Sequence, residues 1–276
     1  MLDIDLAWGQ MQGARKSQQD TAAILSWPNG FRLLLLADGM GGQVGGDIAS
    51  KLVVDRFKQH FTENSSAADI RSRLIAAMNA ANLAVAEAVA AQPELAGMGT
   101  TLVAVAFDGT AIQWLSVGDS PMWLIRQGNI ARLNEDHSMA VKLAERVAAG
   151  EMTAEQAARA PERSQLLEAI LGETIELCDA PATAMELYPG DWLVIASDGV
   201  ETCSEPQIRT IAEQSSSADY SSEAFISTLL DSIESIGRPS QDNASMIALR
   251  VLNSDQEPST AQPASGEVIT AQPKSR

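Results

Sequence analysis

Short apolar runs separated by turn residues constrain the fold of this chain more than any other feature of its sequence. The pattern occurs in residues 21–37, 101–117 and 122–133. In the first of these, Asn29-Gly30 separates two apolar runs, an arrangement typical of a tight β-hairpin. Consecutive hairpins pair their strands antiparallel. The chain is therefore predicted to contain antiparallel sheet.

Two segments have the apolar spacing of helices. In residues 70–89, apolar side chains recur every three or four positions and form one stripe. A second stripe in residues 47–61 follows a glycine-rich stretch, residues 39–46. Strand groups with helices between them predict an α+β domain, most simply two packed sheets with helices outside.

A single folded domain is predicted to span residues 1–252. Within it, residues 134–172 contain few large apolar side chains and are expected to form a helical flap. Helices are predicted in residues 140–150 and 163–172, with a capping box from Thr153 to Gln156 between them. Residues 253–276 are rich in Ser, Thr, Pro and Gln, which predicts a disordered tail.

Charge and composition exclude several classes of partner. The chain has 19 Lys and Arg against 36 Asp and Glu, a net charge of −17 that repels nucleic acid and anionic membranes. No signal peptide or membrane span of about 20 apolar residues is expected. Cys178 and Cys203 have no metal-site spacing and are interpreted as core thiols of a reducing compartment. We therefore expect a cytoplasmic protein.

Aspartates recur where apolar runs stop. Asp38, Asp119 and Asp198 each follow such a run, and Asp242 comes just before one. Each alone is an ordinary turn residue. If the strand ends converge, however, their carboxylates repel one another and need a cation. Hard oxygen ligands suit Mg²⁺ or Mn²⁺, so the pattern favours metal-assisted hydrolysis of a phosphate ester.

The glycine-rich stretch and the histidines are less specific than the aspartates. The stretch Gly39–Gly46 is either a flexible turn or a loop that brings backbone close to another strand or to an anion at a helix start. It matches neither the G-x-G-x-x-G pattern nor the P-loop. The only two histidines are His60 and His137. His60 is interpreted as a surface or cap residue, and His137 as a structural residue at the root of the flap.

An ordered series of motifs resembles the metal-dependent protein phosphatases, the type 2C Ser/Thr phosphatases, in their bacterial form. The resemblance extends over about residues 9–250. Its motifs are Arg15-x-x-Gln18-Gln19-Asp20, Ala37-Asp38-Gly39-Met40-Gly41-Gly42, Gly99-Thr100-Thr101, Val117-Gly118-Asp119-Ser120, Asp136-His137-Ser138, Ser197-Asp198-Gly199 and Asp242-Asn243-Ala244-Ser245.

The resemblance implies a four-layer sandwich in which helices flank two antiparallel sheets, with a dinuclear metal centre at one end. Asp38 matches the aspartate that bridges the two Mn²⁺ or Mg²⁺ ions. Asp198 and Asp242 match ligands of the first ion, and the carbonyl of Gly39 matches a ligand of the second.

The resemblance also assigns the remaining roles. Asp20 would hold waters of the metal centre, and Asp119 would share a weaker third ion with Asp198. Arg15 would bind the phosphate, so the expected catalytic residues are Arg15, Asp20 and Asp38. A hydroxide bridging the two ions would attack phosphorus without a covalent intermediate. Met40 stands where animal members carry a histidine, so water would protonate the leaving group.

The implied activity is hydrolysis of phosphoserine and phosphothreonine, opposing a bacterial Ser/Thr kinase. The expected partners are phosphorylated proteins, including substrates of the kinase and the kinase itself, and the protein is expected to act as a monomer. Two alternatives remain: a catalytically silent regulatory binding module of the same fold, and a phosphatase of an anti-sigma factor antagonist.

Overall fold

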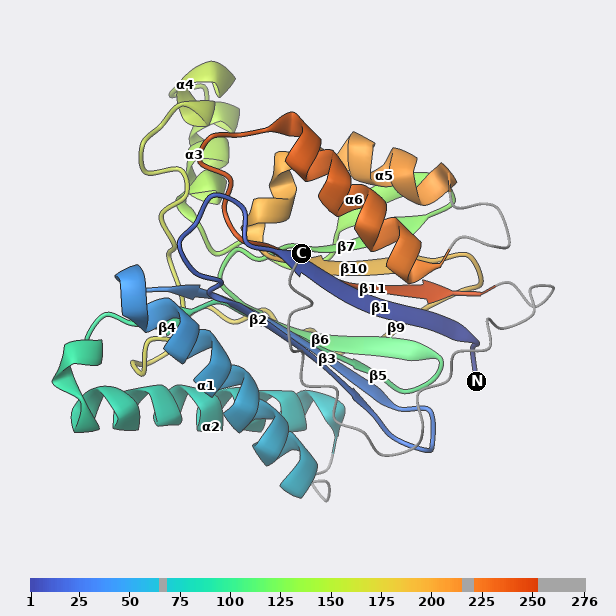
Figure 1. Ribbon diagram of the computed structural model, residues 1–276, viewed down its shortest axis with the longest axis horizontal. Helices are drawn as coiled ribbons and strands as arrows, with labels where there is room; N and C mark the ends of the chain where they lie inside the picture. The colour runs from blue at the N-terminus through green and yellow to red at the C-terminus, as the bar shows by residue number, and fades with distance from the viewer. Residues whose placement is uncertain (65–68, 215–220, 253–276) are drawn as a thin grey trace.

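Two antiparallel sheets lie face to face in the computed structural model, which describes residues 1–64, 69–214 and 221–252 (Figure 1). The first sheet has the order β1 (Ile4–Met11), β11 (Ala244–Val251), β10 (Trp192–Ala196), β7 (Met122–Arg126), β8 (Asn129–Arg132). The second has the order β2 (Asp20–Ser26), β3 (Arg32–Met40), β5 (Leu102–Phe107), β6 (Ala111–Val117), β9 (Met185–Glu186), and β4 (Gly99–Thr100) pairs with β3.

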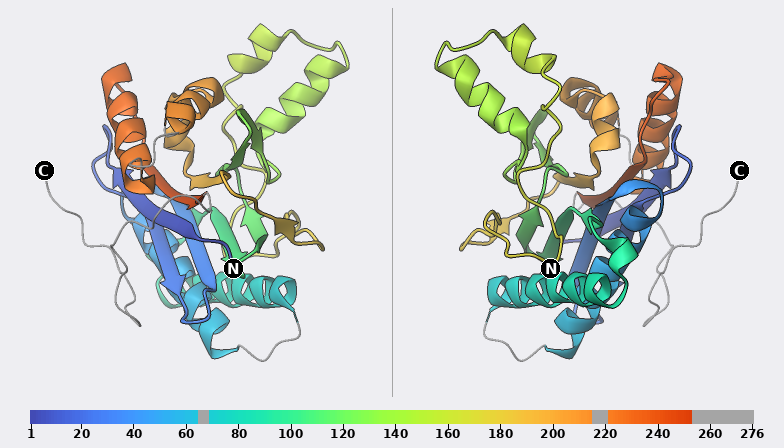
Figure 2. Two further views of the ribbon diagram at one scale, coloured as in Figure 1. Left: turned by 90° about the vertical axis from the view of Figure 1, so that its right-hand side faces the viewer. Right: turned by 90° about the vertical axis from the view of Figure 1, so that its left-hand side faces the viewer.

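Helices cover the outer face of each sheet, which gives four layers (Figure 2). The second sheet is covered by α1 (Gly42–Glu63) and α2 (Ile70–Ala91), and the first by α5 (Glu205–Gln214) and α6 (Ser222–Ile236). The short helices α3 (Met139–Ala148) and α4 (Ala154–Ala158) project from the body. Single-turn helices occupy Pro93–Leu95 and Asp198–Thr202.

The central strands are buried on both faces, which explains their continuous apolar runs. In β3, Leu33 and Leu35 pack toward α1 and α2, whereas Leu34 and Leu36 pack between the sheets. The first sheet repeats this division, with Val194 packing toward its helices. Three apolar clusters therefore separate the four layers and confirm the predicted sandwich.

All three predicted hairpins are confirmed: β2 pairs with β3, β5 with β6, and β7 with β8. The predicted apolar stripe of α2 is also confirmed, because its most buried members include Leu74, Met78 and Val85. The expected start of α1 is wrong. This helix begins at Gly42, so most of the glycine-rich stretch forms its first turns.

The flap is only partly as predicted. α3 and the capping box of Thr153 with Gln156 are confirmed. The helix expected in residues 163–172 is absent from this described segment. Its backbone hydrogen-bonds to other segments instead: Ile170 N donates to Thr100 O at 2.9 Å, and Ile170 O accepts from Thr100 N at 3.1 Å. The long-range pairing and burial of Ile170 outweigh the local helical pattern.

By length and composition, α2 is long and apolar enough to cross a membrane. This contradicts the expectation that the chain contains no such segment. The helix packs on the second sheet, however, and Arg71 and Arg73 near its start donate to Ala180 O and Phe61 O.

The two cysteines, both predicted to be core thiols, differ in burial: Cys203 is buried as expected, but Cys178 is exposed. The tail predicted for residues 253–276 lies outside the described residues.

Candidate metal centre

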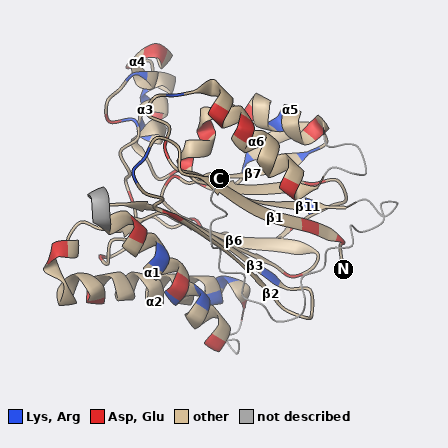
Figure 3. Ribbon diagram, viewed as in Figure 1, with Lys and Arg blue, Asp and Glu red and all other residues tan. Residues whose placement is uncertain are grey.

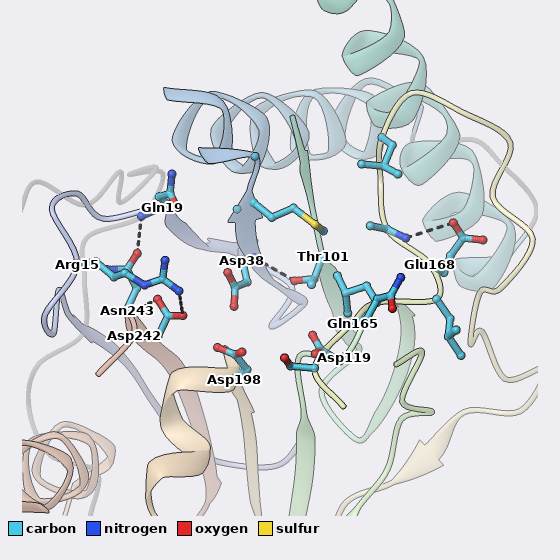
Figure 4. A pocket seen from close by; sticks show the side chains of 18 of the residues that line it. Arg15, Gln19, Asp38, Thr101, Asp119, Gln165, Glu168, Asp198, Asp242 and Asn243 are labelled. Atoms are coloured by element: carbon cyan, nitrogen blue, oxygen red, sulfur yellow. Dashed lines mark hydrogen bonds and ion pairs between the residues drawn. The ribbon is translucent and has the colours of Figure 1, made fainter. Parts of the chain in front are cut away.

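A cavity of about 860 Å³ opens at one end of the sandwich, where strand ends of both sheets meet. The carboxylates of Asp38, Asp119, Asp198 and Asp242 line it, together with Arg15 (Figure 4). Asp38 ends the apolar part of β3 in the second sheet. Asp198 follows β10 and Asp242 precedes β11, both in the first sheet. The predicted strand-end aspartates thus face a common space.

Two glycines allow this convergence. A Cβ on Gly199 would lie 1.9 Å from the carbonyl oxygen of Asn243, so only glycine lets the Asp198 turn touch the Asp242 turn. A Cβ on Gly39 would lie 2.1 Å from Gly46 O in the first turns of α1. The glycines next to Asp38 and Asp198 therefore serve close backbone packing.

The backbone of Asp38 is fixed by two threonines to which the sequence analysis assigned no role. Thr101 Oγ1 accepts a hydrogen bond from Asp38 N at 3.0 Å, and Thr100 Oγ1 donates to Asp38 O at 2.8 Å. Thr101 Oγ1 also lies 2.7 Å from Ser120 Oγ, beside Asp119. The sequence shows that Thr100 and Thr101 belong to a motif, but their contacts with Asp38 are known only from the folded structure.

Asp20 lies behind the cavity wall rather than in it. It pairs with Asp38 in the β2–β3 register and is 6% exposed. Ser197 Oγ donates to its Oδ2 at 2.8 Å, whereas Oδ1 is buried without a hydrogen-bond partner of good geometry among the described residues. Burial raises the pKa of Asp20 to about 6, although nearby serine hydroxyls oppose the rise.

Burial and neighbouring charges raise the pKa values of three cavity carboxylates, those of Asp38, Asp119 and Asp198. Burial, followed by the charges of Asp20 and Asp198, raises the pKa of Asp38 well above its ordinary value. Burial and Asp242 raise the pKa of Asp198. Burial and Asp198 raise that of Asp119 to about 7. Without cations the cluster therefore favours bound protons, which is the electrostatic character of a cation site.

Arg15 lies on the loop between β1 and β2 and forms an ion pair with Asp242. This contact raises the pKa of Arg15. Asn243, another residue without an assigned role in the sequence analysis, holds the loop. Its Oδ1 accepts from Gln19 N at 2.9 Å, and its Nδ2 donates to Gln12 O at 2.8 Å and Ser17 O at 3.1 Å. The loop position of Arg15 is thus fixed by the residue next to Asp242.

The donor set fits hard divalent cations. It consists of the cavity carboxylate oxygens and the backbone of Gly39, which also lines the cavity, with the buried Oδ1 of Asp20 behind the wall. In the described part of the chain, no three His, Cys, Asp or Glu side chains already form a closed metal cage. Mg²⁺ retains several waters and uses only one or two carboxylates, so an open arrangement is compatible with it.

The segment of the flap that follows α4 forms another wall of the cavity. The sequence analysis assigned no individual residues to this wall. Residues 164–169 line it, including Gln165 and the 38% exposed Leu167. Glu168 shapes this segment, because its Oε2 accepts from Glu176 N at 2.7 Å and Leu177 N at 3.0 Å. The flap is therefore part of the site rather than a detached subdomain.

Comparison with known proteins gives concordant results. The model of the family described as Protein phosphatase 2C matches residues 12–246. The serine/threonine protein phosphatase PstP of Mycobacterium tuberculosis is 36% identical over 171 residues, which cover 62% of this chain and 32% of PstP. A putative protein phosphatase 2C-type of Streptococcus pyogenes is 33% identical over 218 residues, which cover 77% of this chain and 85% of that protein.

Solved structures agree with the sequence relatives. The catalytic domain of PstP, crystallised in complex with two manganese ions, is 28% identical and superimposes with a TM-score of 0.72. The superposition covers 92% of this chain and all of that one. This chain therefore matches about a third of the full PstP sequence but the whole of its catalytic domain structure.

Proposed function

The chain belongs to the protein phosphatase 2C family, and we propose that it is a metal-dependent phosphatase of phosphoserine and phosphothreonine in proteins. The observation that carries the proposal is the convergence of four aspartates and Arg15 on one cavity. Carboxylates alone would repel a phosphate ester. Cations among them would reverse that repulsion and leave Arg15 to select the phosphate.

The residues that would hold two Mn²⁺ or Mg²⁺ ions are Asp38, shared by both, with Asp198 and Asp242 toward one and the Gly39 carbonyl toward the other. Asp119, with Asp198, would hold a weaker third ion. When bound, such ions lower the pKa of water and neutralise charge on the phosphate. The raised pKa values of Asp38 and Asp119 and the two manganese ions of the PstP structure support this assignment.

The chain's own residues bind and orient the substrate. The side chain of Arg15 is 56% exposed and is free to turn from Asp242 to two phosphate oxygens, since a cation would replace it at Asp242. Asp20 Oδ1, buried and without a partner of good geometry among the described residues, would accept a hydrogen bond from a water of the centre. Together these groups align water for in-line attack.

The proton for the leaving group would come from water rather than from an imidazole. Water attacks phosphorus, the bond to the serine or threonine oxygen breaks, and the alkoxide takes a proton as inorganic phosphate is released. Neither histidine is among the residues that line the cavity in the described part of the chain, and Met40 occupies the wall beside Asp38. Solvent in the open cavity is therefore the proton donor.

The proposed substrates are phosphorylated proteins, among them the targets of a Ser/Thr kinase and the kinase itself, in the cytoplasm. The names of the M. tuberculosis and S. pyogenes relatives support the phosphoprotein class. The net charge of −17 disfavours nucleic acid as a partner. We further propose that the protein acts as a monomer.

The test is direct. Protein stripped of metal by a chelator should hydrolyse neither an aryl phosphate nor a phosphothreonine peptide, and Mn²⁺ should restore both activities. Arg15→Lys is the informative variant, because it keeps the charge but loses the bidentate fork. Absence of metal-dependent turnover in the wild type would contradict the proposal and favour the silent binding module of the same fold.

A further inference from the structure

His137 connects two parts of the cavity that come from separate segments. It lies between β8 and α3, and it is 4% exposed. Its backbone N–H donates to Gly118 O at 3.1 Å, and Gly118 N–H donates to its ring Nδ1 at 3.2 Å. Gly118 comes directly before Asp119. Two hydrogen bonds from one residue thus fix the turn that presents Asp119.

The same residue holds the segment of the flap that follows α4. The carbonyl of His137 accepts from Leu167 N at 2.8 Å, and Met139 N donates to Gln165 O at 2.9 Å. Gln165 and Leu167 both line the cavity. One buried residue is therefore hydrogen-bonded both to the flap, through its carbonyl, and to the turn before Asp119, through its backbone N–H and its ring.

The hydrogen bond to the ring determines its protonation. Because Nδ1 accepts from Gly118, the neutral ring must carry its proton on Nε2. Among the described residues Nε2 has no hydrogen-bond partner, and Glu135 Oε2 lies 3.9 Å away. Burial lowers the pKa of His137, against the opposing charges of Glu135, Asp179, Asp136 and Glu168. The surroundings thus favour the neutral ring that the contact requires.

We propose that His137 is a positioning residue that couples the placement of the flap to that of Asp119. The coupling requires a hydrogen-bond acceptor at the position of Nδ1, not simply a side chain that fills the space. It rests on the proposed phosphatase function, because its kinetic consequence is measured as turnover. A displaced Asp119 turn would lower kcat, and a displaced flap would raise KM for a phosphopeptide.

Two similar amides separate positioning from packing. In His137→Asn, the amide oxygen can occupy the position of Nδ1 and accept from Gly118. In His137→Gln, the longer side chain carries its amide toward the position of Nε2. Both variants are polar and uncharged. His60→Gln is the matched control, because His60 lies in the last turn of α1 and is not among the cavity residues.

The experiment measures kcat and KM with Mn²⁺ for an aryl phosphate and a phosphothreonine peptide, together with thermal unfolding. We expect His137→Gln to lose about ten- to a hundredfold in kcat on the aryl phosphate, the effect of a small misplacement in a catalytic site. It should also raise KM for the peptide. His137→Asn should retain most wild-type kcat, and His60→Gln all of it. Equal activities of the Asn and Gln variants would overturn the proposal.

A second measurement does not depend on activity. With two histidines in the chain, long-range proton–nitrogen NMR spectra of histidine-labelled protein can identify the ring tautomer of each. His137 should be neutral with its proton on Nε2. A proton on Nδ1 would overturn the positioning proposal even if the protein is an active phosphatase. An inactive wild type with the expected tautomer would instead contradict the proposed function alone.

Discussion

Replacing Asp119 by Asn should stabilise the metal-free protein at alkaline pH. The cavity raises the pKa of Asp119 from its ordinary value of 3.8 to about 7, first through burial and then through Asp198. An acid that binds its proton more tightly in the folded state contributes stability below its ordinary pKa and loses it as pH rises through the folded value. The charged carboxylate therefore destabilises the fold above about pH 7, and an amide cannot acquire that charge.

The size of the effect follows from the same pKa. At 1.36 kcal/mol per pH unit, the rise corresponds to about 4 kcal/mol at pH 8. Water in the open cavity screens the charge, so we expect about half of this, about 2 kcal/mol. For a domain of this size, that difference raises Tm by about 4 to 8 °C.

The assay is thermal or urea unfolding in the presence of a chelator, at about pH 4 and about pH 8. Asp119→Asn should match the wild type at the lower pH and exceed it at the higher. Asp55→Asn is the control, since Asp55 is a surface residue paired with Lys58 on α1. A variant that is less stable at pH 8, or shifted equally at both pH values, would refute the electrostatic argument.

Four further outcomes are expected. Asp198→Asn or Asp242→Asn should abolish most Mn²⁺-dependent turnover while the protein stays folded, as measured by kinetics beside circular dichroism; full activity at saturating Mn²⁺ would contradict their metal role. Asp119→Ala should retain two tightly bound ions by metal analysis but turn over more slowly, and loss of the tight ions would assign it to the main centre. Asn243→Ala removes three hydrogen bonds to the Arg15 loop. It should therefore cost about 2 to 4 kcal/mol in urea unfolding, and an unchanged stability would show that the loop is held elsewhere. Arg15→Lys should raise KM for an aryl phosphate more than it lowers kcat, and unchanged kinetics would exclude Arg15 from phosphate binding.

The sequence predicted the features that depend on local chemistry. Asn29-Gly30 between two apolar runs predicted a hairpin. The apolar stripe of α2 predicted a helix that packs against a sheet. The aspartates at strand ends could be identified because each interrupts an apolar run. The family resemblance then placed them in order along the chain.

Features that depend on tertiary pairing could not be predicted. Residues 163–172 have a helical pattern, yet Ile170 pairs with Thr100 and Leu167 with His137, both distant in sequence. The glycines up to Gly46 indicated a loop, but those from Gly42 onward lie in the first turns of α1. The backbone of Gly46 contacts that of Gly39 there, and this contact could not be read from the sequence. The contacts of Thr101 and Asn243 likewise exist only once separate strands are assembled.

The position of the carboxylates across the two sheets has a thermodynamic consequence. Asp38 belongs to the second sheet, while Asp198 and Asp242 adjoin the first. An ion bound by all three would therefore cross-link the two sheets. By linkage, a ligand that binds only the assembled pair of sheets opposes their separation, and the benefit grows with the logarithm of its concentration. Conversely, a cavity made in the apolar layer between the sheets, for example by Ile195→Ala, would lower the stability of the metal-free protein, and bound ions would offset part of that loss. Cellular metal supply would then set not only the rate of this protein but also its lifetime against unfolding.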